Sequence, residues 1–198
     1  DLQFLWLISL IDSTDSQQTR ALTASTVAFT ACFAVWTIFS IIGLQIQKDL
    51  GLSETEFGLL VGTPILSGSL IRLVLGIWSD QYGGRIVYVS VMVTAAIATF
   101  LLITVDTYLM YLVAALGIGV AGGSFAVGIA YTSRWYPTEK QGTALGIFGL
   151  GNVGAAVTKF IAPFVMVAFG WHAVAQIWAA ALLLMAAIFW FVTDDEPQ

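Results

Sequence analysis

Two cationic side chains interrupt long apolar stretches of this sequence. Arg72 lies within the stretch 57–79, and Lys159 lies within the stretch 142–168. A cation among apolar residues is costly, so such a side chain usually faces a polar interior and has a partner there. The guanidinium of Arg72 is planar and presents parallel N–H donors that match a planar oxyanion. The two residues therefore indicate a binding site for a small anion.

Both cations also have structural explanations that require no bound anion. Arg72 could bond to the carbonyl groups of neighbouring helices, and Lys159 could extend along its helix to the outer surface. If Lys159 faces a cavity instead, it provides a second positive charge or a group that releases a proton during a reaction cycle.

Other chemically reactive groups are sparse. His172 and Cys32 are the only residues of their types, and no nucleotide-binding loop of the form G-x-x-x-x-G-K-S/T is present. A metal site needs several such ligands close together, and ATP hydrolysis needs the glycine-rich loop. We therefore expect no cofactor, no bound metal and no enzymatic activity.

The composition indicates that lipid surrounds the chain. Of its 198 residues, 59% are apolar and 10% are charged, and the mean hydropathy is +0.91. A soluble chain has roughly 45–50% apolar and about 25% charged residues, because its surface faces water. The excess of acidic over basic residues argues against binding to nucleic acid. The predicted class is an all-α integral membrane protein.

Six segments are long enough to cross the bilayer as helices of about 20 residues. They are predicted at about 22–47, 57–79, 86–105, 108–133, 142–168 and 173–193. An even number of spans puts both ends on one side, and basic residues mark the cytoplasmic side. One side holds Arg20, Arg85, Arg134 and Lys140, whereas the other holds only Lys48. Both ends are therefore expected to be cytoplasmic.

The two ends of the chain are predicted to lie outside the six-helix bundle at 21–193. Residues 1–20 begin with about ten mostly apolar residues, which are too few to span a bilayer and suit the membrane surface. Residues 12–18 are expected to form a polar linker. The acidic residues 194–198 are expected to begin a cytoplasmic loop.

The loop from Gly76 to Arg85 contains two adjacent glycines after an aspartate. Gly83 and Gly84 permit a tight turn with positive φ, and Asp80 is suited to cap the next helix and to pair with a basic residue. The pattern resembles the G-x-x-x-D-x-x-G-R/K loop of the major facilitator superfamily, which joins the second and third helices on the cytoplasmic side. The resemblance implies a gating role for Gly76, Asp80, Gly84 and Arg85.

The fifth predicted span is rich in glycine. At 100° per residue, Gly142, Gly146 and Gly149 fall on one side of a helix, and Gly151 and Gly154 fall on another. The stripe between these two sides is expected to carry Leu145, Phe148, Asn152, Ala155 and Lys159. Such a helix, packed closely on both flanks, is typical of a pore lining.

This glycine pattern, from Gly146 to Val157, resembles the signature of the nitrate/nitrite porter family, and Ser67 to Arg72 resembles that family's anion-binding segment. The family implies one six-helix half of a major facilitator superfamily transporter. It assigns the signature glycines Gly146, Gly149, Gly151 and Gly154 to the fifth helix. It assigns substrate contacts to Arg72, Phe33, Phe125 and Asn152, with Lys159 as a weaker assignment because family members differ at that position.

The resemblance implies transport of nitrate and/or nitrite across the inner membrane, with both ends of this segment cytoplasmic. Proton-coupled symport is the favoured mechanism, and nitrate/nitrite antiport is the close alternative. A non-transporting six-helix assembly or signalling subunit is the alternative from another class. The expected partners are the anions, protons, the lipid bilayer and a second six-helix half.

Overall fold

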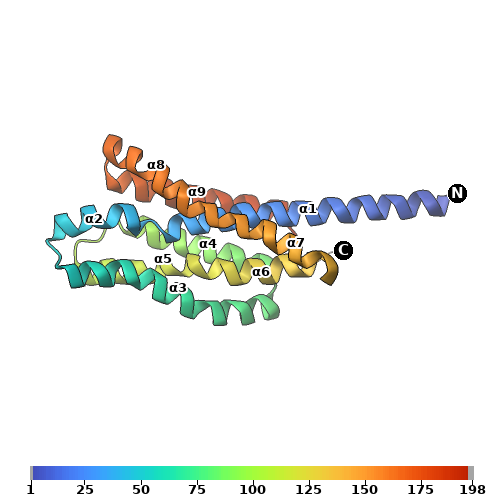
Figure 1. Cartoon of the computed structure of the whole chain (residues 1–198), viewed down its shortest axis with the longest axis horizontal. Helices are drawn as coiled ribbons and strands as arrows, with labels where there is room; N and C mark the ends of the chain where they lie inside the picture. Colours follow the sequence, from blue (N-terminus) through green and yellow to red (C-terminus); the bar gives the residue numbers. More distant parts are fainter. Residues whose placement is uncertain (1, 196–198) are drawn as a thin grey trace.

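The computed structural model describes the backbone of residues 2–195 and the side chains of residues 15–195. Helices joined by short turns make up this range (Figure 1). In chain order the elements are α1 (Leu2–Trp36), α2 (Phe39–Leu50), α3 (Glu54–Tyr82), α4 (Gly84–Leu101), α5 (Tyr108–Gly119), η1 (Val120–Gly123), α6 (Ser124–Trp135), α7 (Thr138–Gly149), η2 (Leu150–Val153), α8 (Gly154–Phe169) and α9 (Trp171–Val192).

Six segments are long and apolar enough to cross a membrane, as the sequence predicts. They are Asp15–Leu50, Glu54–Tyr82, Gly84–Leu101, Tyr108–Trp135, Thr138–Phe169 and Trp171–Val192. The third ends four residues earlier than the predicted 105. After Leu101 the amides of residues 102–104 bond to carbonyls three residues earlier, which tightens the chain into turns. Thr107 then accepts a hydrogen bond from the Met110 amide and caps the start of α5.

The prediction of a polar linker at 12–18 is wrong, because α1 runs without a break from Leu2 to Trp36. This stretch contains no glycine or proline to end a helix, and the Thr19 hydroxyl bonds to the Asp15 carbonyl one turn earlier. A helix of 35 residues is about 50 Å long, so its N-terminal part projects beyond the bundle (Figure 1). The side chains of residues 2–14 and all of residues 196–198 lie outside the described range, so the expected membrane-surface segment and cytoplasmic loop remain predictions.

Three of the six spans are interrupted near their middle. The first is broken at Thr37–Ile38, where the Thr37 hydroxyl bonds to the carbonyls of Phe33 and Ala34. The fourth and fifth contain the 3₁₀ segments η1 and η2, in which glycine lowers the preference for the α-helix. The interruptions are neighbours in space: η1 and η2 both pack against α1, and the break at Thr37–Ile38 follows the end of α1.

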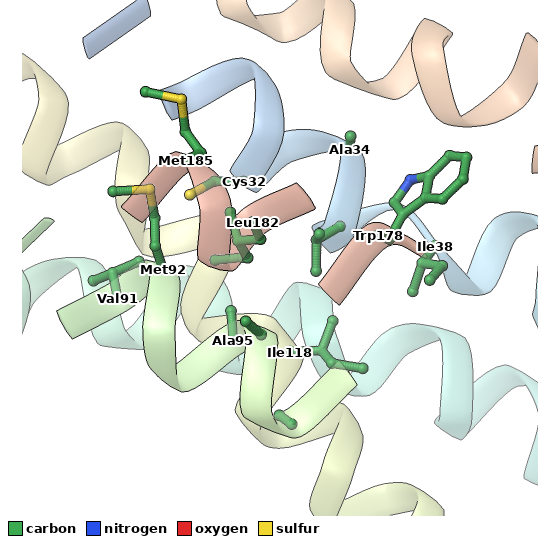
Figure 2. Packing of buried hydrophobic residues seen from close by; sticks show 14 of the residues in the cluster. Cys32, Ala34, Ile38, Val91, Met92, Ala95, Ile118, Trp178, Leu182 and Met185 are labelled. Carbon is green, nitrogen blue, oxygen red and sulfur yellow. The ribbon is translucent and has the colours of Figure 1, made fainter. Parts of the chain in front are cut away.

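The core lies between α1, α4, α6 and α9. Small residues such as Ala95 on α4 and Cys32 on α1 allow these helices to pack closely, and Met92, Leu182 and Met185 fill the space between them (Figure 2). The spans α3 and α7–α8 are the least buried. In their most apolar stretches 22% and 17% of the residues are buried, against 44–56% in the other four spans. These two spans are therefore the ones that the rest of the bundle covers least.

Candidate functional site

Arg72 lies on α3, half-buried beside the 3₁₀ segment η1. Its Nε donates a hydrogen bond to the Gly122 carbonyl at 3.1 Å. Its guanidinium carbon lies 5.4 Å from the centre of the Phe125 ring and 5.9 Å from that of Trp36. Among residues 15–195, Nε is the only atom of this guanidinium with a hydrogen-bond partner, and no carboxylate forms a salt bridge with it. Its two terminal nitrogens therefore keep their N–H donors for another ligand.

Glycines let the neighbouring helices come close enough to Arg72 to hold it. A Cβ added at Gly122 would lie 2.6 Å from the Trp36 ring, and one at Gly68 would lie 2.7 Å from the Gly119 carbonyl oxygen. Real Cβ atoms do not approach other atoms so closely, so only glycine fits at these two positions. These two glycines thus let the Gly122 carbonyl and the Trp36 indole lie next to the cation.

An aromatic cluster adjoins the guanidinium. Phe29 stacks on Phe148 with ring centres 4.8 Å apart and lies 5.6 Å from Phe125. Phe33 lies 5.1 Å from Trp36 and 5.4 Å from Phe29. Phe125 therefore lies directly beside Arg72, whereas Phe33 is connected to it through Trp36 and through Phe29 and Phe125. The rings supply a weakly polar wall on one side of the cation.

Sequence reasoning missed Trp36, which contacts both Arg72 and Phe33. Its Nε1 donates to the Pro64 carbonyl at 2.9 Å, which fixes the indole between α1 and α3. The available signal was its spacing, because a residue three positions after Phe33 lies on the same helix face. Trp36 is also the last residue of α1 before the break.

The prediction that Phe148, Asn152 and Lys159 share one helix face is wrong. Phe148 is buried against α1, whereas Asn152 and Lys159 are exposed. The four residues of η2 turn by about 120° each instead of 100°, which rotates the following helix by roughly 80° relative to the expected stripe. Asn152 lies in η2, and its Nδ2 donates to the Gly149 carbonyl at 2.8 Å within the same span.

Lys159 borders a pocket of about 210 Å³ between α2, α3 and α8. The other lining residues come from the end of α1, the break after it, α2 and the N-terminal half of α3: Trp36, Thr37, Phe39, Ser40, Val61 and Ile65. Trp36 is therefore common to this pocket and to the surroundings of Arg72. The structure thus places Lys159 at the edge of a largely apolar pocket that shares Trp36 with the Arg72 site.

The signature glycines divide into two groups. A Cβ on Gly151 would overlap the Phe29 ring, and one on Gly154 would overlap the Thr30 carbonyl oxygen, so these two allow close packing on α1. Gly146 and Gly149 have open space at their Cβ positions. Within the described chain the fifth span is packed closely on one flank only, so the expectation of contact on both flanks is wrong for this half.

The loop between α3 and α4 differs in part from its predicted roles. Asp80 pairs with Arg134, with 3.0 Å between Oδ1 and Nη2, and does not cap the next helix. The backbone amide of Arg85 instead donates to Asp195 Oδ1 at 2.7 Å, so Asp195 caps α4. Asp80 is unsuited to capping because it still belongs to α3, which ends two residues later.

The remaining loop residues define the turn and its packing. Gly83 has φ +92°, as predicted, whereas Gly84 is helical and is required for its close approach to the Tyr131 side chain. The guanidinium carbon of Arg85 lies 4.2 Å from the Trp190 ring centre, and its Nη2 donates to the Trp190 carbonyl. Gly76 has no neighbour within 4 Å of a Cβ position.

Residues 24–198 match the family described as Major Facilitator Superfamily. A protein named probable nitrate/nitrite antiporter NarK1, from Thermus thermophilus, is 41% identical over 191 residues, which cover 90% of this chain and 43% of that protein. Probable nitrate/nitrite transporter NarK2 from Mycobacterium tuberculosis is 35% identical over 83% of this chain and 42% of its own length. Nitrite extrusion protein from Bacillus subtilis is 30% identical over 92% of this chain and 46% of its own length.

A solved structure shares the fold. It is a bacterial homologue of the human lysosomal transporter Spinster in an inward-facing, unoccupied conformation, with a TM-score of 0.80 and 20% identity over 91% of this chain and 44% of that chain. The chain spans less than half the length of the curated relatives it matches. The predictions of fold and family are confirmed. The chain belongs to the Major Facilitator Superfamily and corresponds to one six-helix half of its nitrate/nitrite porters.

Proposed function

We propose that this chain forms half of a secondary transporter that carries nitrate and/or nitrite across the inner membrane. The observation that carries the proposal is the Arg72 guanidinium, which is held through Nε and lacks a carboxylate partner among residues 15–195. An unpaired cation at this depth is costly unless it meets an anion during function. The names of the curated relatives support nitrate and nitrite as that anion.

The shape and chemistry of the site suit a planar, weakly hydrated anion. Two terminal guanidinium nitrogens can donate parallel hydrogen bonds to two oxygens of nitrate or nitrite. Phe125 at one side of the guanidinium, with Phe33 behind Trp36, limits the access of water. Asn152 is a further proposed ligand, because its Nδ2 uses one N–H on the Gly149 carbonyl and has a second N–H to donate to the anion.

The uncovered faces of α3 and α7–α8 support a second six-helix half as the partner of this chain. Both spans bear large exposed apolar side chains, among them Leu66, Leu70 and Leu73 on α3. Transporters of this kind bind substrate between two halves near the middle of the membrane. Arg72 lies on α3, so the second half would complete the site around it.

Two forms of energy coupling are proposed, with proton symport ahead of exchange. Lys159 supports symport because it is a titratable side chain on the uncovered face of a span, well away from either end. Exchange is supported by the name of the Thermus thermophilus relative, a probable nitrate/nitrite antiporter. Because the basic residues gather toward one side, we propose that both ends of this segment are cytoplasmic.

Transport by the complete protein, with this chain and its second half in sealed proteoliposomes, tests the proposal. We expect nitrate uptake driven by an inward proton gradient and accompanied by acidification of the vesicle interior. Replacing Lys159 with Gln should abolish that acidification and leave nitrate/nitrite exchange in part. Nitrate uptake that requires internal nitrite and does not depend on the proton gradient would establish exchange instead. No nitrate or nitrite movement under either gradient would overturn the function and favour a non-transporting membrane subunit.

A further inference from the structure

We propose that Lys159 and the Ser40 hydroxyl beside it form a second anion site on the outer side of Trp36, from which the anion passes to Arg72. The inference rests on the proposed function and adds a site to it. The pocket of about 210 Å³ that Lys159 borders has room for a small anion with attached water. Its polar groups available to an anion are the ammonium of Lys159 and the Ser40 hydroxyl, because the Thr37 hydroxyl is bonded to the Phe33 and Ala34 carbonyls.

The pocket is displaced from Arg72 toward the outer end of the bundle. Val61 and Ile65, which line it, precede Arg72 on α3 by seven to eleven residues, or about 10–16 Å along the helix axis. α3 begins at Glu54, on the side assigned to the exterior, and ends in the loop assigned to the cytoplasm. An anion entering from outside would therefore meet Lys159 before it meets Arg72.

The charge at this pocket is uncompensated. Among residues 15–195, no acidic side chain lies within salt-bridge distance of Lys159. A single cation in a recess with low-dielectric walls raises the local concentration of anions. The Ser40 hydroxyl now bonds to the Thr37 carbonyl at 2.7 Å, but Ser40 is exposed, so its hydrogen can turn to an anion at little cost.

Trp36 connects the two sites. One side of the indole borders the Lys159 pocket, and the Arg72 guanidinium carbon lies 5.9 Å from its ring centre. The first span is broken at Thr37, directly after Trp36, so the indole lies at the junction of two helical segments, α1 and α2. Two adjacent sites of moderate affinity let an ion enter readily and still leave, which a single tight site would prevent.

The test measures nitrate/nitrite exchange by the complete protein from each side of oriented proteoliposomes, because exchange does not depend on the proposed proton coupling by Lys159. Lys159→Gln should raise the KM for external nitrate about tenfold, as expected for a lost charge-assisted contact, and leave the KM for internal nitrate unchanged. Lys159→Arg keeps the charge and should keep the external KM near wild type. Lys48→Gln is the matched control, because it removes a cation from the same side at an exposed position away from the pocket.

A second variant keeps the test valid if Lys159→Gln folds poorly. Lys159→Cys can be labelled after folding with a thiol reagent that adds an ammonium or one that adds a sulfonate. Cys32 is the only native cysteine of this chain and is buried, so it should stay unlabelled. The ammonium adduct should restore the external KM, and the sulfonate adduct should raise it further.

The possible failures separate the two proposals. If wild-type protein does not move nitrate, the proposed function fails. If wild type transports nitrate but Lys159→Gln has an unchanged external KM, the outer site is overturned and the function stands. An equal rise of KM on both sides would also overturn the outer site, because Lys159 would then belong to the central site with Arg72.

Discussion

Gly154 and Gly146 belong to the same glycine-rich span, yet the structure predicts opposite effects of replacing each with alanine. A Cβ on Gly154 would overlap the Thr30 carbonyl oxygen and lie 2.8 Å from the Ala34 amide nitrogen. Both contacts are with backbone atoms of α1, which cannot turn aside as a side chain could. The alanine therefore forces α8 away from α1. Gly146 has no neighbour within 4 Å of its Cβ position, so alanine adds no clash there.

The size of the effect follows from the displaced contacts. Overpacking of this kind costs about 1–3 kcal/mol. One turn beyond Gly154, the Thr158 hydroxyl donates to the Ala34 carbonyl at 2.6 Å and accepts from Trp178 at 2.9 Å, and loss of this buried bond adds about 1 kcal/mol. Alanine regains up to about 1 kcal/mol in helix preference at either position. The expected result is a net loss of roughly 1–3 kcal/mol for Gly154→Ala and a gain of up to about 1 kcal/mol for Gly146→Ala.

Denaturant unfolding of this chain in detergent, followed by tryptophan fluorescence, would measure the free energy of unfolding for both variants. The two alanine variants make the same chemical change in one span, so each controls for the other. The packing argument is refuted if Gly154→Ala is as stable as Gly146→Ala.

The loop between α3 and α4 supports two further predictions. Asp80→Asn removes the carboxylate that pairs with Arg134, so the cytoplasmic ends of α3 and α6 should separate more readily. Cysteine labelling of the complete transporter from the cytoplasmic side should then increase, and unchanged labelling would count against a gating role. Gly83→Ala places a Cβ at φ +92° and 2.8 Å from Asp195 Oδ1, which should cost about 1–3 kcal/mol in the free energy of unfolding, and equal stability would contradict the strain.

Local patterns were enough to predict the six spans and to single out Arg72 as a candidate. The spans follow from the lengths of the apolar stretches, because lipid requires about 20 residues for each crossing. Arg72 follows from its depth within one of them, where a charge must have a reason. The close approach of α1 at Gly151 and Gly154 was also predictable, since small residues on one face of a helix favour tight packing.

The parts that could not be predicted depend on contacts between distant residues. Asp195 caps a helix whose first amides lie 110 residues earlier, and a sequence pattern gives no sign of that pairing. The break at Thr37 lacks the glycine or proline that usually marks one. The 3₁₀ segment η2 changed which residues share a face, and period counting at 100° per residue assumes that no such segment exists.

Nitrate binding to the complete transporter, measured by calorimetry for wild type and Arg72→Lys, tests the central claim most directly. Lysine keeps the positive charge but lacks the planar fork and the Nε that donates to the Gly122 carbonyl. The account predicts that nitrate affinity falls at least about tenfold, which corresponds to the loss of one charge-assisted hydrogen bond. An affinity of Arg72→Lys equal to that of wild type, in a variant that inserts and folds normally, would remove Arg72 from the anion site.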